Sequence, residues 1–187
     1  MIPGNFGCYI AAAPSLDLLD WEKDEDGKIM YERDYNLRVQ HERGRRRYLC
    51  LDRKGVRDEF HKHNGFEACD LCGPDDEFVM VKPASSSSPL SHLFAQALNS
   101  VSTLLTSPTA RQRFAAIVEE VSDGERRVSG DFCPKKVVFA ILLKKGEALT
   151  ADTLFPFSQV TLVHVAKVLQ TQYNIEIEVI GSHAKIT

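Results

Sequence analysis

The chain has 187 residues, 43% of them hydrophobic, which is enough apolar sequence for one core and favours a single folded domain. Its 23 basic and 26 acidic residues nearly balance, which excludes a whole-surface attraction to nucleic acid but leaves local basic runs. Five cysteines without a secretory leader predict reduced thiols in a cytoplasmic protein. The early apolar run CYIAAAP is too short to span a bilayer, so we expect no membrane segment.

The first part of the chain has the pattern of turns and short strands. An acidic turn or linker at 21–28 divides an N-terminal segment (1–28) from a single α/β domain (29–187). The charge-rich stretch 29–47 fits either a helix or an irregular segment. Strands are predicted at 47–52, 65–73 and 78–82. The last of these is almost entirely apolar, as expected for a strand that is covered on both faces.

The rest of the chain alternates helices and strands. Apolar residues three and four positions apart form one stripe from Leu90 to Leu105, and Ser88 followed by Pro89 is a typical helix start. The same serine-proline signal predicts a second helix over 108–121. A strand at 135–145, a helix at 156–173 and a half-exposed edge strand at 175–181 follow. This order predicts an α/β fold, with a mixed sheet of about five strands and helices packed on it.

Four charged residues stand near the ends of the predicted strands: Asp52, Glu67, Asp70 and Lys82. Carboxylates on adjacent strands can hold a divalent metal such as Mg²⁺, which polarises a phosphate and activates water. A nearby lysine then stabilises the developing negative charge. A strand with an acid, then a strand ending in lysine, then a helix, resembles the layout of the PD-(D/E)xK nuclease core. We therefore predict that Asp70 and Glu67 hold Mg²⁺, that Asp52 or Glu32 assists, and that Lys82 contacts the scissile phosphate.

Three observations oppose this interpretation. The position two before Lys82, where the motif has a carboxylate, is Met80. Along one strand Glu67 and Asp70 would point to opposite faces, unless a bulge or the strand end turns one of them. In a long hairpin Asp70 would lie near the turn, and its distance from Lys82 could exceed about 10 Å. The alternative is that Glu67 and Asp70 are solvated charges at a strand end.

The serine run at 85–88 and the helix that follows offer hydroxyl groups, free backbone N–H groups and the positive end of a helix dipole. All three features favour an anion. A phosphate next to Lys82 is therefore predicted to contact Ser87, Ser88, Ser91 and His92. The alternative is a capped helix after a polar turn, with an exposed histidine.

Two other stretches carry weaker signals. The segment HKHNGFEACDLC holds possible zinc ligands, namely His61, His63, Cys69 and Cys72. A lone CxxC is weaker than two paired ones, and thiols within a strand would diverge, so structural zinc is not expected. The run RGRRR at 43–47, with Arg53 and Lys54, forms a basic patch that fits a nucleic-acid backbone or a solvated turn equally well.

Six segments together resemble the blocks of a sporadically distributed bacterial family of unknown function: ERDYN, LCLDRK, FEACDL, FVMVK, SSSSPLSHLFAQ and LFPFSQVTL. Its members read like E-CDLL, HVK, SS-LSHLF-Q and LPFFSK-NL in the same order. The resemblance covers about residues 30–181, and the matching polar residues are Glu32, Asp52, Glu67, Asp70, Lys82, Ser91 and His92. Met80 replaces a histidine of the pattern, Cys72 a leucine and Gln159 a lysine. Family members are longer, so this chain resembles a form that lacks a middle portion.

The resemblance implies a defence-type protein, because the family's patchy distribution is similar to that of defence and mobile-element genes. Our leading hypothesis is a nuclease-like domain that hydrolyses phosphodiesters of DNA or RNA with Mg²⁺, or a degenerate form that only binds them. The alternative is a non-catalytic regulatory or assembly module that pairs with a partner chain or a second copy through the edge strand 175–181.

Overall fold

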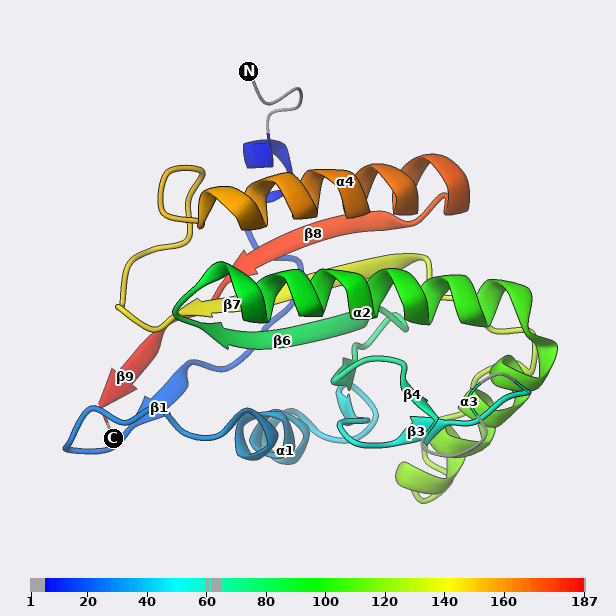
Figure 1. Cartoon of the computed structure of the whole chain (residues 1–187). Coiled ribbons are helices and arrows are strands. Elements are labelled where there is room, and N and C mark those ends of the chain that lie inside the picture. The colour runs from blue at the N-terminus through cyan, green and yellow to red at the C-terminus, as the bar shows by residue number, and fades with distance from the viewer. Residues whose placement is uncertain (1–5, 60, 62–64, 187) are drawn as a thin grey trace.

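The computed structural model describes residues 6–59, 61 and 65–186 (Figure 1). The helices are η1 (Phe6–Tyr9, a 3₁₀ turn), α1 (Glu32–Arg43), α2 (Ser87–Thr106), α3 (Pro108–Val121) and α4 (Pro156–Tyr173). The strands are β1 (Trp21–Lys23), β2 (Leu49–Cys50), β3 (Gly55–Val56), β4 (Phe66–Glu67), β5 (Leu71–Cys72), β6 (Phe78–Ala84), β7 (Lys136–Leu143), β8 (Glu176–Gly181) and β9 (Ala184–Ile186). Across these described ranges no helix is long and apolar enough to cross a bilayer.

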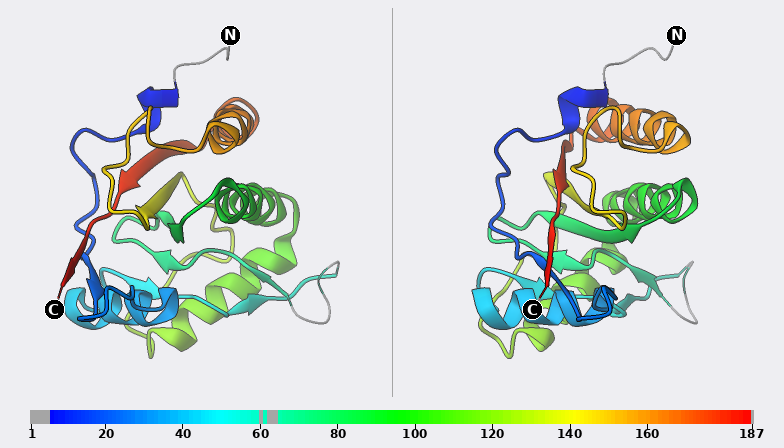
Figure 2. Two further views of the ribbon diagram at one scale, coloured as in Figure 1. Left: turned by 60° about the vertical axis from the view of Figure 1, so that its left-hand side comes forward. Right: turned by 90° about the vertical axis from the view of Figure 1, so that its left-hand side faces the viewer.

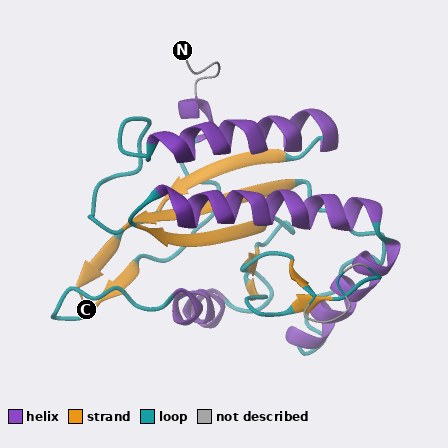
Figure 3. Cartoon of the chain, viewed as in Figure 1, coloured by secondary structure: helices purple, strands orange, loops and turns teal. Residues whose placement is uncertain are grey.

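The main sheet has five strands in the order β2-β5-β6-β7-β8, which confirms the predicted mixed α/β sheet (Figure 3). Strands β2, β5 and β6 run antiparallel, whereas β6, β7 and β8 run parallel. Parallel neighbours need a crossover connection, which α2 and α3 supply between β6 and β7 and α4 supplies between β7 and β8. The antiparallel part is short, since β2 and β5 have only two residues each.

The two faces of the sheet are buried in separate cores because side chains alternate along each strand. Helices α2 and α4 lie side by side on one face (Figure 2), where Phe94 of α2 packs edge-on against Phe139 of β7, with ring centroids 4.9 Å apart. On the other face Val81 and its neighbours pack with residues of α1 and the N-terminal stretch. Trp21 stacks on Tyr35 there, with centroids 4.1 Å apart, and both side chains are fully buried. The acidic stretch 21–28 therefore begins with a core residue.

Several expected boundaries differ from the structure. The single strand expected at 65–73 is two short strands in different sheets, since β4 pairs with β3 while β5 pairs with β2 and β6. The strand expected at 47–52 shrinks to β2. Helix α2 begins at Ser87 after Ser86, two residues before the predicted start, and no side chain caps it. The second serine-proline signal is confirmed, because the Ser107 hydroxyl accepts a hydrogen bond from the Ala110 N–H at 3.1 Å.

Strand β8 lies at the edge of the main sheet, as expected, but it is not half-exposed. Residues 177–180 are buried, since α4 covers one face and the second core covers the other. The outer edge is also occupied in its middle, where the Ala11 N–H donates to the Val179 carbonyl at 3.0 Å. Glu178, the buried carboxylate of this strand, pairs with Lys136 at 2.5 Å. A partner strand at this edge would have to displace the segment around Ala11.

Candidate functional site

The site begins where β6 runs past the end of its short neighbour β5. Leu71 lies opposite Val79, so the remaining part of β6, from Val81 to Ala84, has no antiparallel partner strand within the described ranges. The Asp70 carboxylate replaces that partner, because its Oδ2 accepts the Val81 N–H at 2.7 Å. Pro83, two residues further along the same edge, has no N–H that would need an acceptor. The Asp70 carboxylate and Pro83 together account for the backbone N–H positions along this edge of β6.

This pairing brings Asp70 next to Lys82. The register places Asp70 one position beyond the Leu71–Val79 pair, and its carboxylate bonds to the residue that precedes Lys82. The Lys82 ammonium is close enough to lower the pKa of the Asp70 carboxyl. Strands β5 and β6 do form an antiparallel hairpin, but its register pairs Leu71 with Val79 and so leaves Asp70 beside Val81, the neighbour of Lys82.

Lys82 forms an ion pair with Glu32, the first residue of α1. Its Nζ lies 2.9 Å from Glu32 Oε2 and 3.3 Å from Oε1. Both side chains are about a quarter exposed, at 29% for Lys82 and 25% for Glu32. A carboxylate in the first turn of a helix also interacts favourably with the positive end of the helix dipole. Lys82 of β6 thus pairs with Glu32 of α1, and it is close enough to influence the titration of Asp70, which precedes β5.

Asp70 is the most perturbed carboxyl of the group. The residue is only 4% exposed. The pKa of Asp70 is raised to about 7, chiefly by burial. The Val81 N–H lowers this pKa, and the nearby charges of Glu32 and Asp52 raise it. Asp70 thus exchanges its proton near neutral pH. We refer to Glu32, Asp52, Asp70 and Lys82 as the charged cluster.

A cavity of about 500 Å³ adjoins the charged cluster and is lined by carboxylates from α1, from β4 and from the turn after β2. Its polar lining residues are Tyr31, Glu32, Arg33, Asp34, Asp52, Arg53 and Glu67. Glu67 also accepts a hydrogen bond from Gln96 of α2 at 3.4 Å. Glu67 and Asp70 do not lie along one strand, because Glu67 ends β4 whereas Asp70 lies in the bend before β5. Arg53 has a φ of 59°, a strained backbone conformation of the kind that gathers at functional sites.

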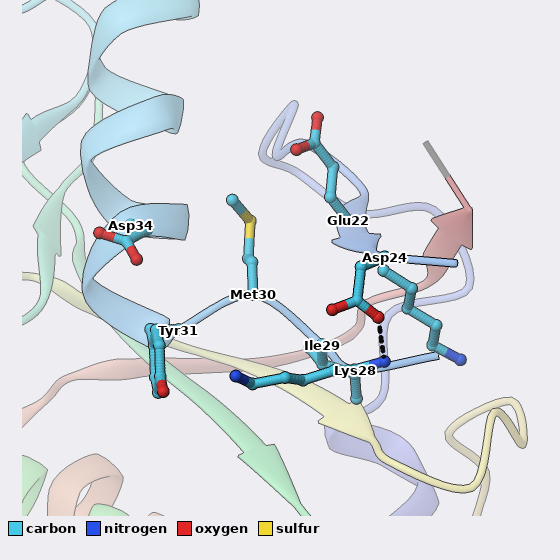
Figure 4. A pocket seen from close by; sticks show the side chains of 8 residues that line it. Glu22, Asp24, Lys28, Ile29, Met30, Tyr31 and Asp34 are labelled. Carbon is cyan, nitrogen blue, oxygen red and sulfur yellow. Dashed lines mark hydrogen bonds between the residues drawn. The ribbon is translucent and has the colours of Figure 1, made fainter. Parts of the chain in front are cut away.

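Tyr31 connects this cavity to two others. One of about 590 Å³ is lined by Tyr31, Glu32, Pro83 and the lysines Lys28 and Lys144, and we call it the lysine cavity. Another of about 420 Å³ is lined by Tyr31, Met30 and the acidic residues Glu22, Asp24 and Asp34 (Figure 4). Tyr31 is 68% exposed. Its ring is thus the common wall of three hollows around the start of α1.

The serines predicted to bind phosphate lie at the start of α2. Ser88 and His92 are exposed and Ser87 is half-buried. The buried Ser91 hydroxyl has no hydrogen-bond partner in the part of the chain that the structure describes. Lys82 lies in the last half of β6, at the end of the sheet where α2 begins. Its ammonium, however, pairs with Glu32 of α1. Neither cavity lined by Glu32 includes a residue of this turn.

The other sequence signals fall outside the charged cluster. Cys69 and Cys72 are buried free thiols, His61 contacts Asp58 at 2.8 Å, and His63 lies outside the described residues. Within the described ranges no three His, Cys, Asp or Glu side chains converge as a metal site. The basic run at 43–47 is largely paired with acids, since Arg43, Arg45 and Arg46 contact Asp17, Asp123 and Glu125, respectively.

Sequence reasoning missed three residues of this region. Tyr31 and Arg33 flank Glu32 and line its cavity. Asn36 lies one turn after Glu32 on α1 and is fully buried, and its amide has no hydrogen-bond partner among the described residues. Arg33 and Asn36 belong to the segment ERDYN, so its match to the family pattern was the available signal. Periodicity could not reveal them, because they surround a site formed by distant segments.

The fold and the site define a mixed α/β domain with a charged cluster at the open edge of its central strand. The chain matches a family of unknown function, DUF6119, over residues 8–181, and it belongs to that family. No curated protein and no solved structure matches the chain.

Proposed function

We propose that this domain acts on nucleic acid and hydrolyses phosphodiester bonds at the charged cluster. The observation that carries the proposal is the junction of β5 and β6. There a buried carboxylate, Asp70, bonds to the backbone beside Lys82, and Lys82 pairs with Glu32. A cation between carboxylates, next to a cavity, is an arrangement that can position a phosphate and an attacking water.

The order of elements supports the proposal. Helix α1 precedes three antiparallel strands, and a crossover helix then leads to parallel strands, with Asp70 before the second main-sheet strand and Lys82 in the third. The succession of an acid, a strand that carries a lysine and a following helix is the part of this order that resembles the PD-(D/E)xK core. The carboxylate missing at Met80, which is fully buried, has a possible replacement in Glu32, whose side chain reaches Lys82 from α1.

The residues present fit a hard cation. No three of the described carboxylates converge. One or two suffice when waters and a substrate phosphate complete the shell, and Asp70, Glu67 and Glu32 each offer the oxygen that Mg²⁺ prefers. Mg²⁺ held there would supply charge to polarise the phosphate and lower the pKa of a water. Lys82 would donate to the non-bridging oxygen on which negative charge develops. Asp52 would orient the attacking water from the wall of the cavity.

The experiment is a cleavage assay with purified protein. Labelled single-stranded DNA, duplex DNA and RNA are incubated with Mg²⁺ or with a chelator, and the products are resolved on denaturing gels. We expect cleavage of at least one substrate with Mg²⁺ and none with the chelator. Asp70→Asn and Lys82→Ala should abolish cleavage in samples that circular dichroism shows to be folded, whereas Lys185→Ala, at an exposed lysine, should not.

The outcomes separate three functions. Binding that weakens with salt, without cleavage of any substrate, would identify a degenerate domain that only holds nucleic acid. If the protein neither bound nor cleaved any of these substrates, the proposal would be rejected. The resemblance to a patchily distributed bacterial family further suggests that the substrate is foreign nucleic acid in a defence-type process.

A further inference from the structure

The lysine cavity differs in charge from the cavity beside it. Two lysines, Lys28 and Lys144, face one carboxylate, Glu32, in its lining. The 500 Å³ cavity instead has four carboxylates against two arginines. A polyanion is therefore attracted to the lysine cavity and repelled from its neighbour unless a cation neutralises that neighbour.

Tyr31 stands at the border between the two cavities. Its ring is 68% exposed, and the Lys28 ammonium lies 5.3 Å from the ring centroid (Figure 4). Tyr31 occupies the N-cap position of α1, but its side chain makes no capping hydrogen bond. Neither a capping bond nor burial therefore accounts for a large aromatic side chain here. An exposed aromatic ring next to lysines is the combination that binds unpaired bases and their phosphates.

We infer that the lysine cavity holds a single strand of nucleic acid, with one base stacked on Tyr31 and the flanking phosphates on Lys28 and Lys144. Pro83 lies in the lining of the same cavity, one residue after Lys82, so a strand held here leads directly to the charged cluster. The inference deepens the proposed function by naming its substrate as an unpaired strand. A duplex would bury its base faces and could not stack on Tyr31.

Binding is measured by fluorescence anisotropy with a chelator present, so that the readout is independent of hydrolysis. The probes are labelled oligo(dT) and oligo(rU) of about 12 nucleotides, within the usual site sizes of single-strand grooves, and a blunt duplex of equal length. The variants are Tyr31→Ala, Tyr31→Phe, Lys28→Ala and Lys144→Ala. The matched controls are Phe157→Ala, which removes an equally exposed aromatic ring on α4, and Lys135→Ala, an exposed lysine elsewhere.

We expect Tyr31→Ala to weaken single-strand binding by roughly 5- to 100-fold, the range for loss of one stacked base. Tyr31→Phe should stay near wild type, because the ring is kept. Each lysine variant should reduce the slope of log affinity against log salt by about 0.7. The two oligonucleotides distinguish DNA from RNA as the preferred source of the strand.

The failures of the two proposals are distinguishable. Cleavage by wild type with unchanged binding by Tyr31→Ala, or equal binding of the blunt duplex, would overturn the strand site and leave hydrolysis standing. Binding lost in Tyr31→Ala, without any cleavage, would support the strand site and overturn hydrolysis. If the wild type neither bound any probe nor cleaved any substrate, both proposals would be overturned.

Discussion

The Asp70 carboxylate accepts the backbone N–H of Val81 at 2.7 Å and so takes the place of a neighbouring strand. One buried side chain thereby performs two tasks. It satisfies a donor at the open edge of β6, and it holds a negative charge beside Lys82. Because the Asp70 carboxyl is nearly inaccessible to solvent, its pKa is close to neutral. The stability of the fold therefore depends on whether Asp70 is protonated.

The first prediction concerns this titration. The pKa of Asp70 is raised to about 7 in the folded chain, against about 4 in the unfolded chain. Between these values the folded state binds one proton more, so stability falls as pH rises through this window. Asp70→Asn removes the dependence, because an amide stays neutral and can still accept from Val81. At pH 8 we expect the free energy of unfolding of the variant to exceed that of wild type by on the order of 2 kcal/mol.

Urea unfolding at a series of pH values measures this effect. Asp34→Asn, on the exposed surface of the same region, is the matched control and should leave the pH profile unchanged. The two pKa values place the expected loss of stability between about pH 5 and 8. A wild-type free energy of unfolding that stays constant over this range would contradict the account of Asp70.

The second prediction tests the link between Glu32 and Asp70. Glu32→Gln removes a negative charge that raises the pKa of Asp70 and frees Lys82 from its ion pair. Both effects lower the pKa of Asp70, which carbon-13 detected titration of the carboxyl would follow. Because the pair is partly exposed, we expect a stability loss of only about 1 kcal/mol or less. Glu22→Gln, which breaks a pair with Arg38, should not move the titration of Asp70.

Much of the fold is visible in the sequence because its longest elements have strong local signals. The predicted helix at 156–173 coincides with α4, which begins at Pro156 and ends before Asn174 in the left-handed conformation, φ 55°. The start of α2 was predicted less well, since four consecutive serines are equally able to precede it. Two-residue strands such as β4 and β5 are too short to show a period, and they form only because their partners exist.

The site was predictable as a set of charges but not as an arrangement. Asp52, Asp70 and Lys82 were singled out because they stand near strand ends, and the structure brings them into one electrostatic cluster. The contact between Glu32 and Lys82 joins residues 50 positions apart, so no local pattern could reveal it. The bond from Asp70 to Val81 depends on β5 being short, which is a property of the whole sheet.

The third prediction concerns the N-terminal stretch as part of the folded core. Trp21 is fully buried and stacked on Tyr35, so Trp21→Ala should destabilise the chain by about 3–5 kcal/mol. Phe157→Ala is the control, because that ring is 68% exposed and should have a small effect. Urea unfolding followed by far-ultraviolet circular dichroism measures both. Equal stabilities of the two variants would show that residues around Trp21 are not required for folding.

The fourth prediction uses the thiols. Burial raises the pKa of Cys72 to about 12 and that of Cys69 well above its usual range, whereas Cys8 is exposed. In a labelling assay with a disulfide reagent at pH 8 we expect Cys8 to react rapidly, and Cys69 and Cys72 only when the chain unfolds. Rapid reaction of Cys69 and Cys72 after treatment with a chelator, but not before it, would instead reveal a zinc site.

The most direct test of the central claim compares Mg²⁺-dependent cleavage rates of wild type and Lys82→Ala on the same labelled strand. Loss of a donor that stabilises developing charge costs about 10²- to 10³-fold in rate, so the variant should fall by at least that factor while it remains folded. Lys185→Ala, which disrupts a surface pair with Asp20, should cleave at the wild-type rate. Equal cleavage by Lys82→Ala and wild type would contradict the assignment of the charged cluster as the reactive site.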